Sequence, residues 1–179
     1  MTGPVTIARR LQKCFLHVQR TRMNDMPLVN EKLKVKAVGF RRWEGCTLGV
    51  LVTPWSMNLI RVADDDERKT LPPPGNKTRH PFPSGDYEFI VGEEPGVGRY
   101  EMCSLFSPMF EFDGQKSAVT TAKEIMTALM DATNPLVGAT AEIPEADETR
   151  GSRPGVGLRL SQPISRRDLL RASFLRGGE

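Results

Sequence analysis

Histidine and cysteine are scarce in this sequence of 179 residues, and their scarcity argues against several classes of site. The two histidines, His17 and His80, are far apart, so neither a histidine-based metal site nor a Ser-His-Asp triad has support. The three cysteines, Cys14, Cys46 and Cys103, form no CxxC pair, which argues against a zinc knuckle or a disulfide framework. We therefore expect a reducing compartment, no metal, no cofactor and no catalytic residues.

Long apolar runs and a strong charge bias are also lacking. No run of 18 apolar residues exists, so no membrane span is predicted, and the first 20 residues lack the apolar stretch of a secretory signal. The net charge of +3, from 25 basic and 22 acidic residues, is too slight to indicate a nucleic-acid binder. These features predict a soluble, cytoplasmic protein.

The longest apolar run with strand character covers residues 43–60. Its β-branched and bulky side chains predict the central strand of a sheet, which Pro54 ends. Because apolar residues occur at both odd and even positions, apolar side chains point to both faces of the strand, and we expect both faces to be covered. The sequence of residues 34–40 predicts an edge strand whose lysines disfavour pairing with the edge of another sheet. The charged and proline-rich residues that follow predict a long surface loop over 63–85.

Two segments have the apolar spacing of amphipathic helices, residues 4–22 and residues 113–131. Thr2 or Thr6 could cap the first helix and Asp113 the second. Between them, residues 86–91 and 99–106 predict a hairpin with Pro95 and Gly96 in its turn, and its inward side chains contribute to the core. Together these elements predict an α+β fold, an antiparallel β-sheet flanked by two amphipathic helices that share one face. The side chains expected to face inward are Ile7, Leu11, either Cys14 or Phe15, Val18, Tyr87, Phe89, Val91, Tyr100, Met102, Ser104, Phe106, Ala118, Ala122, Ile125 and Leu129.

The remaining chain differs in composition and predicts a second region. Residues 1–135 form the predicted globular domain, and residues 136–179 a flexible tail rich in Pro, Gly and charge, with disorder over 138–162. Ser165 and Asp168 fit a capping box, which predicts a short basic amphipathic helix that forms only against another surface.

Interaction is favoured over catalysis by two features of the sequence. Trp55, Met57, Met109 and Phe110 follow prolines at strand ends, where a partner could reach them, and burial in the core is the alternative. The second feature is the C-terminal helix, whose partner-binding residues would be Arg166, Arg167 and Leu170.

Three stretches of the sequence together resemble one known family. TLGVLVTPWSMNLI, FPSGDYEFIVGEEPGVGRYEMCSLFSPMFEF and AKEIMTALM are similar to the HybE/HoxT/HupJ family of nickel-iron hydrogenase assembly chaperones, and the resemblance covers residues 5–132. It implies a cytoplasmic, non-enzymatic protein that holds the precursor of the small, iron-sulfur subunit until its clusters and the large subunit are in place, before twin-arginine export. Some relatives carry or work with a rubredoxin-like module, which needs two CxxC pairs. A separate protein would supply it here.

The tail suggests a further hypothesis, because SRRDLLR at residues 165–171 resembles the SRRxFLK twin-arginine motif of exported proteins. The tail could mimic a leader, either in a leader-binding groove or in competition for a leader-binding partner. A chance basic helix is the alternative. Two other functions also stay open: an iron-sulfur or redox-handling protein that uses Cys46 and Cys103, and, less favoured, a nucleic-acid binder that uses the tail.

Overall fold

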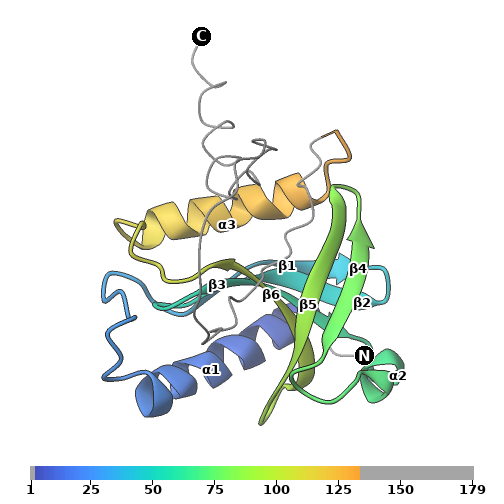
Figure 1. Ribbon diagram of the computed structural model, residues 1–179, viewed down its shortest axis with the longest axis horizontal. Coiled ribbons are helices and arrows are strands. Elements are labelled where there is room, and N and C mark those ends of the chain that lie inside the picture. Colours follow the sequence, from blue (N-terminus) through green and yellow to red (C-terminus); the bar gives the residue numbers. More distant parts are fainter. Residues whose placement is uncertain (1–2, 134–179) are drawn as a thin grey trace, which may run out of the picture. The chain divides into compact units, whose positions relative to one another are not determined.

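The computed structural model describes residues 3–133, which fold around one six-stranded antiparallel sheet (Figure 1). The strand order is β1-β2-β3-β6-β5-β4, which confirms the predicted α+β class. None of the helices in this part of the chain is long and apolar enough to cross a membrane. The helices are α1 (Pro4–Arg22), α2 (Asp65–Thr70) and α3 (Gln115–Leu129), and the strands are β1 (Lys36–Trp43), β2 (Cys46–Val52), β3 (Met57–Ala63), β4 (Lys77–Phe82), β5 (Gly85–Glu94) and β6 (Gly98–Phe106).

The two long helices cover opposite faces of the sheet, α1 below it and α3 above it in Figure 1. On one face, Ile7, Leu11 and Phe15 of α1 join a buried cluster with Leu51 of β2 and Ile60 of β3. On the other face, α3 packs on β1 and β2. The prediction that both helices share one face is therefore wrong. Because β2 and β3 are buried along their whole length, one uncovered face would leave half of their side chains in water.

The apolar run at 43–60 contains two strands rather than one. β2 is an interior strand, as predicted, but it lies second from the edge, and β3 and β6 occupy the centre. β1 forms the predicted edge and ends in a two-residue turn at Glu44 and Gly45, with φ of 35° and 74°. Within β2, a Cβ on Gly49 would lie 2.3 Å from the Cδ2 atom of Phe40. Glycine therefore lets the Phe40 ring lie directly on the backbone of β2.

The predicted hairpin is confirmed and is longer than expected. β5 and β6 are joined by a turn in which the backbone N–H of Val97 donates to the carbonyl of Glu94 at 3.1 Å. Gly96 has a φ of 80°, as a glycine after proline in a type II turn requires. The hairpin buries most of the predicted side chains, whereas Met102 is half-buried and Ser104 is exposed. Those confirmed as buried are Tyr87, Phe89, Val91, Tyr100 and Phe106.

The two predicted amphipathic helices are present, and their caps are not those predicted. Gly3 and Gly114 occupy the N-cap positions, and neither helix has a side-chain cap hydrogen bond, so the caps predicted at Thr6 and Asp113 are wrong. The helix predicted over 113–131 ends earlier, at Leu129. The apolar residues predicted for the inner faces are buried, namely Ile7, Leu11, Val18, Ala118, Ala122, Ile125 and Leu129, and of the alternatives Cys14 and Phe15 it is Phe15 that is buried.

The long loop predicted over 63–85 is wrong, because the segment contains α2 and β4. Helix α2 has acidic residues in its first turn and basic residues in its last turn. These charges interact favourably with the helix dipole and so stabilise the helix. Strand β4 pairs only with β5, so it is an edge strand. An edge strand can include Pro81, because the N–H that proline lacks can fall on the unpaired side.

Residues 134–179 lie outside the described part of the chain. The disorder predicted over 138–162, the C-terminal helix and the roles of Arg166, Arg167 and Leu170 therefore stay predictions.

Candidate functional site

The loops that follow α1, β2 and β6 meet at one end of the central strands, and Asn30 joins them. Its backbone N–H donates to the carbonyl of Pro54 at 2.8 Å. Its side-chain Nδ2 donates to the carbonyls of Met109 and Phe112, both at 3.0 Å. Asn30 is 9% exposed, so these bonds satisfy carbonyl groups that water reaches poorly. Asn30 thus joins three chain segments that are distant in sequence, through its backbone N–H to the loop after β2 and through its side chain to the loop after β6.

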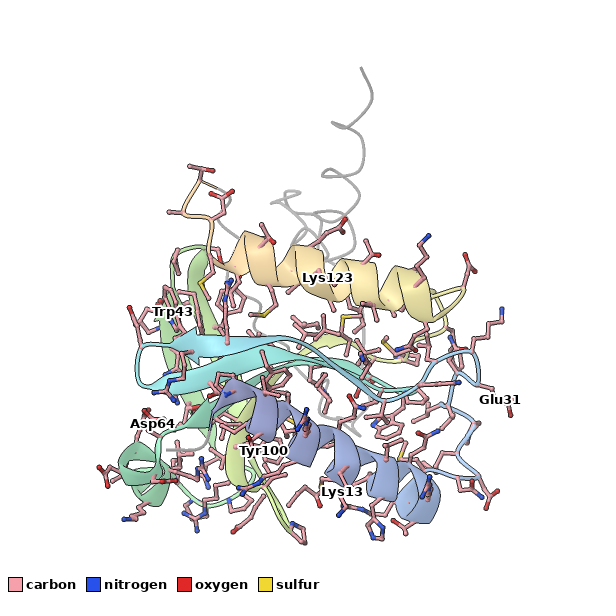
Figure 2. The ribbon with its side chains drawn as sticks, turned by 180° about the vertical axis from the view of Figure 1, so that it is seen from behind. Lys13, Glu31, Trp43, Asp64, Tyr100 and Lys123 are labelled. Carbon is pink, nitrogen blue, oxygen red and sulfur yellow. The ribbon has the colours of Figure 1, made fainter. Side chains whose placement is uncertain are left out.

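Exposed apolar side chains extend from these joined loops. Phe110 is 58% exposed, Met26 44% and Leu28 43%. Trp55 is half-buried and packs against the core cluster between α1 and the sheet. We call these four residues the loop surface. Figure 2 shows this end of the molecule near Glu31, opposite the end marked by Trp43 and Asp64. Because large exposed side chains of this kind are few among residues 3–133, the loop surface is a candidate interaction surface.

Two of the partner-binding residues expected from the sequence lie in the core. Met57 and Met109 are both 0% exposed, so neither can be reached by a partner in this conformation. Met57 belongs to the interior strand β3, and Met109 lies below the loop surface, where its carbonyl accepts from Asn30. Trp55 and Phe110 are the expected residues that stay accessible within the described part.

The same loops have more acidic than basic side chains at their surface. Between α1 and β1, and between β6 and α3, four carboxylates are exposed and two lysines accompany them. Apolar groups beside carboxylates suit a partner segment that is apolar and basic. The carboxylates are Asp25, Glu31, Glu111 and Asp113, and the lysines are Lys32 and Lys34.

A second group of polar residues lies within the sheet around Glu101, which is 0% exposed. The carboxylate of Glu101 accepts hydrogen bonds from Arg61 of β3, and from Thr78 Oγ1 at 2.5 Å and His80 Nε2 at 2.7 Å, both on β4. Arg61 also donates through Nη2 to Glu67 of α2 at 2.6 Å. The network therefore joins both central strands to the edge strand and to α2.

Two opposing effects set the pKa of Glu101. Burial raises this pKa, while the hydrogen bonds from His80 and Thr78 and the charge of Arg61 lower it. The hydrogen bonds and the charge are stronger, and the pKa falls from 4.5 to about 2. Glu101 is therefore ionised at neutral pH, and its partners are groups that stabilise the charge.

The cysteines do not form a common site. Cys46 lies opposite Ala63, and Cys103 lies opposite Leu59, on the β3 strand that separates them. Four residues along the strand and two strand spacings across place the two cysteine Cα atoms about 16 Å apart. Burial raises the pKa of Cys46 to about 11, which disfavours the thiolate that binds metals. This geometry is inconsistent with an iron-sulfur site that uses both thiols.

Sequence reasoning missed the residues that organise both regions. Asn30 gives no signal in the sequence, because an asparagine in a loop is ordinary. Glu101 gives a weak one, since it alternates with Tyr100 and Met102 in a strand and could face a covered side. His80, placed by the sequence in a loop, belongs to β4. Residues 3–133 contain no group of three or more His, Cys, Asp or Glu side chains placed to hold a metal ion.

Known proteins resemble this chain in sequence and in fold. The family model described as "[NiFe]-hydrogenase assembly, chaperone, HybE" matches residues 6–172. "Probable rubredoxin HupJ" of Rhodobacter capsulatus is 44% identical over 139 residues, 78% of this chain and 48% of that protein, so the chain spans about half the length of this relative. "Protein HoxT" of Cupriavidus necator is 42% identical over 133 residues, 68% of this chain and 74% of that protein. The solution structure of HybE from Escherichia coli has the same fold, with a TM-score of 0.56 and 22% identity, over 90% of this chain and 94% of that one.

Proposed function

This chain belongs to the HybE family of nickel-iron hydrogenase assembly chaperones, and we propose that it binds the precursor of the hydrogenase small subunit, which carries the iron-sulfur clusters. In this proposal the chain acts in the cytoplasm and without catalysis. It holds the precursor until the clusters and the large subunit are in place, before twin-arginine export.

The loop surface is the observation that carries this proposal. A twin-arginine leader combines basic and apolar residues, and the loop surface places exposed apolar side chains beside carboxylates. Asn30 fixes the loops before a partner arrives, so that less conformational entropy is lost on binding. The proposed contact is therefore between the leader of the precursor and Trp55, Phe110 and their neighbours.

A rubredoxin-like module would be a separate partner in this proposal. Rubredoxin-type iron requires four thiolates, and this chain contains three cysteines. The relative named a probable rubredoxin is about twice as long as its matched region. We therefore propose that a separate protein supplies any such iron site, and that the large subunit joins after the precursor is bound.

The proposal is tested by capture of the small subunit on this tagged protein from cytoplasmic extract. Two forms of the small subunit are compared, the precursor with its twin-arginine leader and the same protein without it. We expect the precursor to be captured and the leaderless form to be captured weakly. Equal capture of both forms would place recognition on the mature domain. Capture of neither, with both proteins folded, would contradict the proposal.

Phe110→Ser provides the sharpest variant for this test. We expect the variant to keep its melting temperature, because the side chain is 58% exposed. We expect its affinity for the precursor to fall by about 2 kcal/mol, or about 30-fold, as for an aromatic residue at the centre of an interface. Titration calorimetry with purified precursor measures the affinity.

Val5→Ser is the matched control, because Val5 is 63% exposed in the first turn of α1, away from the joined loops. Its affinity should be unchanged. Equal losses in both variants would show that general surface hydrophobicity, rather than the loop surface, binds the precursor.

A further inference from the structure

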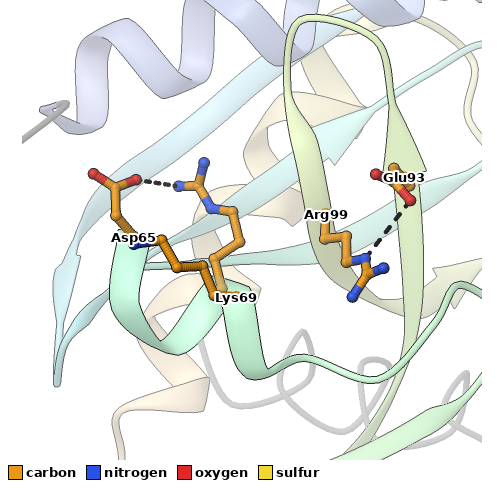
Figure 3. A pocket seen from close by; sticks show the side chains of 5 residues that line it. Asp65, Lys69, Glu93 and Arg99 are labelled. Atoms are coloured by element: carbon orange, nitrogen blue, oxygen red, sulfur yellow. Dashed lines mark ion pairs between the residues drawn. The ribbon is translucent and has the colours of Figure 1, made fainter.

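A polar hollow of about 630 Å³ lies between α2 and the β5–β6 hairpin, and none of the functions proposed above uses it. Figure 3 shows its lining, with Asp65 and Lys69 on the helix and Glu93 and Arg99 on the hairpin. Arg68 of α2 completes it. The hollow thus has three cations and two carboxylates around an open space.

The arginines of the hollow are held in place by backbone carbonyls. Arg68 donates through Nε and Nη2 to the carbonyl of Ala63, at 3.2 Å and 2.9 Å. Arg99 donates through Nη1 to the carbonyl of Leu71 at 2.8 Å. These bonds orient the guanidinium groups and leave their charge intact. The rest of each planar fork is free to bind an external carboxylate.

Ion pairs within the hollow are long. Arg68 lies 3.9 Å from Asp65, and Arg99 lies 3.6 Å from Glu93. Charge-assisted hydrogen bonds are normally about 2.7 to 2.9 Å long. Elsewhere on the same surface, Arg22 binds both oxygens of Glu94 at 2.7 Å, so short pairs do form in this protein. The cations of the hollow are therefore incompletely neutralised by their neighbours.

The basic surface continues from the hollow onto α1. A narrow cleft that shares Arg68 with the hollow is lined by Arg10 of α1 at its edge and by the apolar side chains of Ile7, Val62 and Val97. Helix α1 contains no acidic residue, and its exposed charged residues are all basic, although Val5, Thr6, His17 and Thr21 lie among them. The exposed cations of that helix are Arg9, Arg10, Lys13, Arg20 and Arg22, of which Arg22 is paired with Glu94.

We propose that the hollow and the adjoining face of α1 bind an acidic segment of a partner protein. Carboxylates of the segment replace the long internal pairs with short ones, and its remaining residues lie along α1. Asp65 and Glu93 disfavour a stiff nucleic-acid duplex, whose phosphates are fixed in position, whereas a flexible peptide can place some carboxylates between them and turn the others to solvent.

This surface is distinct from the loop surface. Strand β3 begins next to Trp55 at the loop surface and ends at Ala63, directly before α2. Strand β6 runs the opposite way, from the hollow toward Phe110. The hollow and the loop surface thus lie at opposite ends of the central strands, about 20 Å apart for seven residues of strand, and the exposed face of α1 begins beside the hollow. Each surface can therefore be tested without the other.

Fluorescence anisotropy of fluorescein-labelled hexaglutamate with the full chain tests this inference at low salt. Arg10→Glu and Lys69→Glu change exposed cations, and among residues 3–133 their only ion pair is that of Lys69 with Asp66 at 3.8 Å. We expect each variant to weaken binding at least tenfold. Lys116→Glu and Lys123→Glu on α3 make the same charge change on the other face of the sheet and should weaken binding less than twofold. Phe110→Ser should have no effect on this binding.

Four results would overturn the inference. The first is that hexaglutamate does not bind, and the second is that the α1/α2 variants and the α3 variants lose the same amount of affinity. The third is that inorganic phosphate at equal charge concentration displaces the peptide. The fourth is that the same cations bind a short DNA duplex more tightly than the peptide. Since the probe contains no hydrogenase sequence, failure here leaves the small-subunit proposal standing, and failure of precursor capture leaves this surface standing.

Discussion

Glu101→Leu is expected to lower the free energy of unfolding by about 3 to 5 kcal/mol, because the substitution leaves the buried cation of Arg61 without its one fully buried partner and with only the partly exposed Glu67. Arg61 is 6% exposed, so water cannot replace the lost carboxylate. Thr78 and His80 lose their acceptor in the same step. Urea unfolding followed by circular dichroism measures the change.

The double variant Glu101→Leu/Arg61→Leu separates the cost of an unpaired charge from the loss of shape. With both charges removed, we expect part of the lost stability to return, since an apolar pair can replace a buried ion pair at little cost. If the double variant is instead less stable than Glu101→Leu, by as much as an independent core substitution would cost, then the unpaired charge of Arg61 is not the main cause of the lost stability. Arg61 also holds Glu67, so some loss should persist through α2.

A pH dependence follows from the same carboxylate. The folded protein lowers the pKa of Glu101 from 4.5 to about 2, so its stabilising contribution is complete above about pH 4.5 and is lost as the pH falls toward 2. The contribution is about 3 kcal/mol. Urea unfolding at a series of pH values measures it. Glu101→Gln is the control and should show a shallower acid dependence over this interval. Equal acid dependence in both proteins would contradict the role of Glu101.

Periodicity in the sequence predicted the elements whose inward side chains are apolar. The four-residue spacing of Ile7 and Leu11 predicted α1, and the two-residue spacing of Tyr87 and Phe89 predicted the hairpin, because these spacings match the periods of a helix and a strand. Strand β4 could not be found in this way. Its one buried apolar residue is Phe82, and its other inward contacts are made by Thr78 and His80 to a carboxylate on β6, so its sequence has no apolar alternation.

The placement of the helices and of the loop surface depends on long-range contacts. The sequence indicated that β2 is apolar on both faces, which required cover on both, but it did not say which helix covers which face. Met109 and Phe110 are adjacent and apolar, yet one is buried and the other is exposed. Asn30, about 80 residues earlier, donates to the carbonyl of Met109. This bond holds the loop in a conformation that buries the side chain of Met109 and exposes that of Phe110. Local patterning contains no information on this contact.

Asn30→Ala is therefore expected to affect both stability and partner binding. The carbonyl of Phe112 loses the donor that Asn30 supplies, and the carbonyl of Met109 keeps the backbone N–H of Phe112 at 3.2 Å. A buried group without a partner costs about 1 to 3 kcal/mol, so we expect a loss of about 1 to 3 kcal/mol in urea unfolding. Asn76→Ala is the matched control, because Asn76 donates to the carbonyl of Pro73 in the same way but is exposed. Its loss should stay below about 1 kcal/mol.

The functional consequence distinguishes Asn30 from an ordinary structural residue. If Asn30 positions the loop surface, the folded Asn30→Ala protein should bind the small-subunit precursor at least tenfold more weakly under conditions where it is more than 95% folded. Phe110→Ser should lose affinity at full stability, and Glu101→Leu should lose stability while the folded fraction keeps its affinity. Unchanged affinity in folded Asn30→Ala would mean that the loops adopt the binding conformation without it. The three variants together then separate a residue that contacts the partner, a residue that positions the contact and a residue that only holds the sheet.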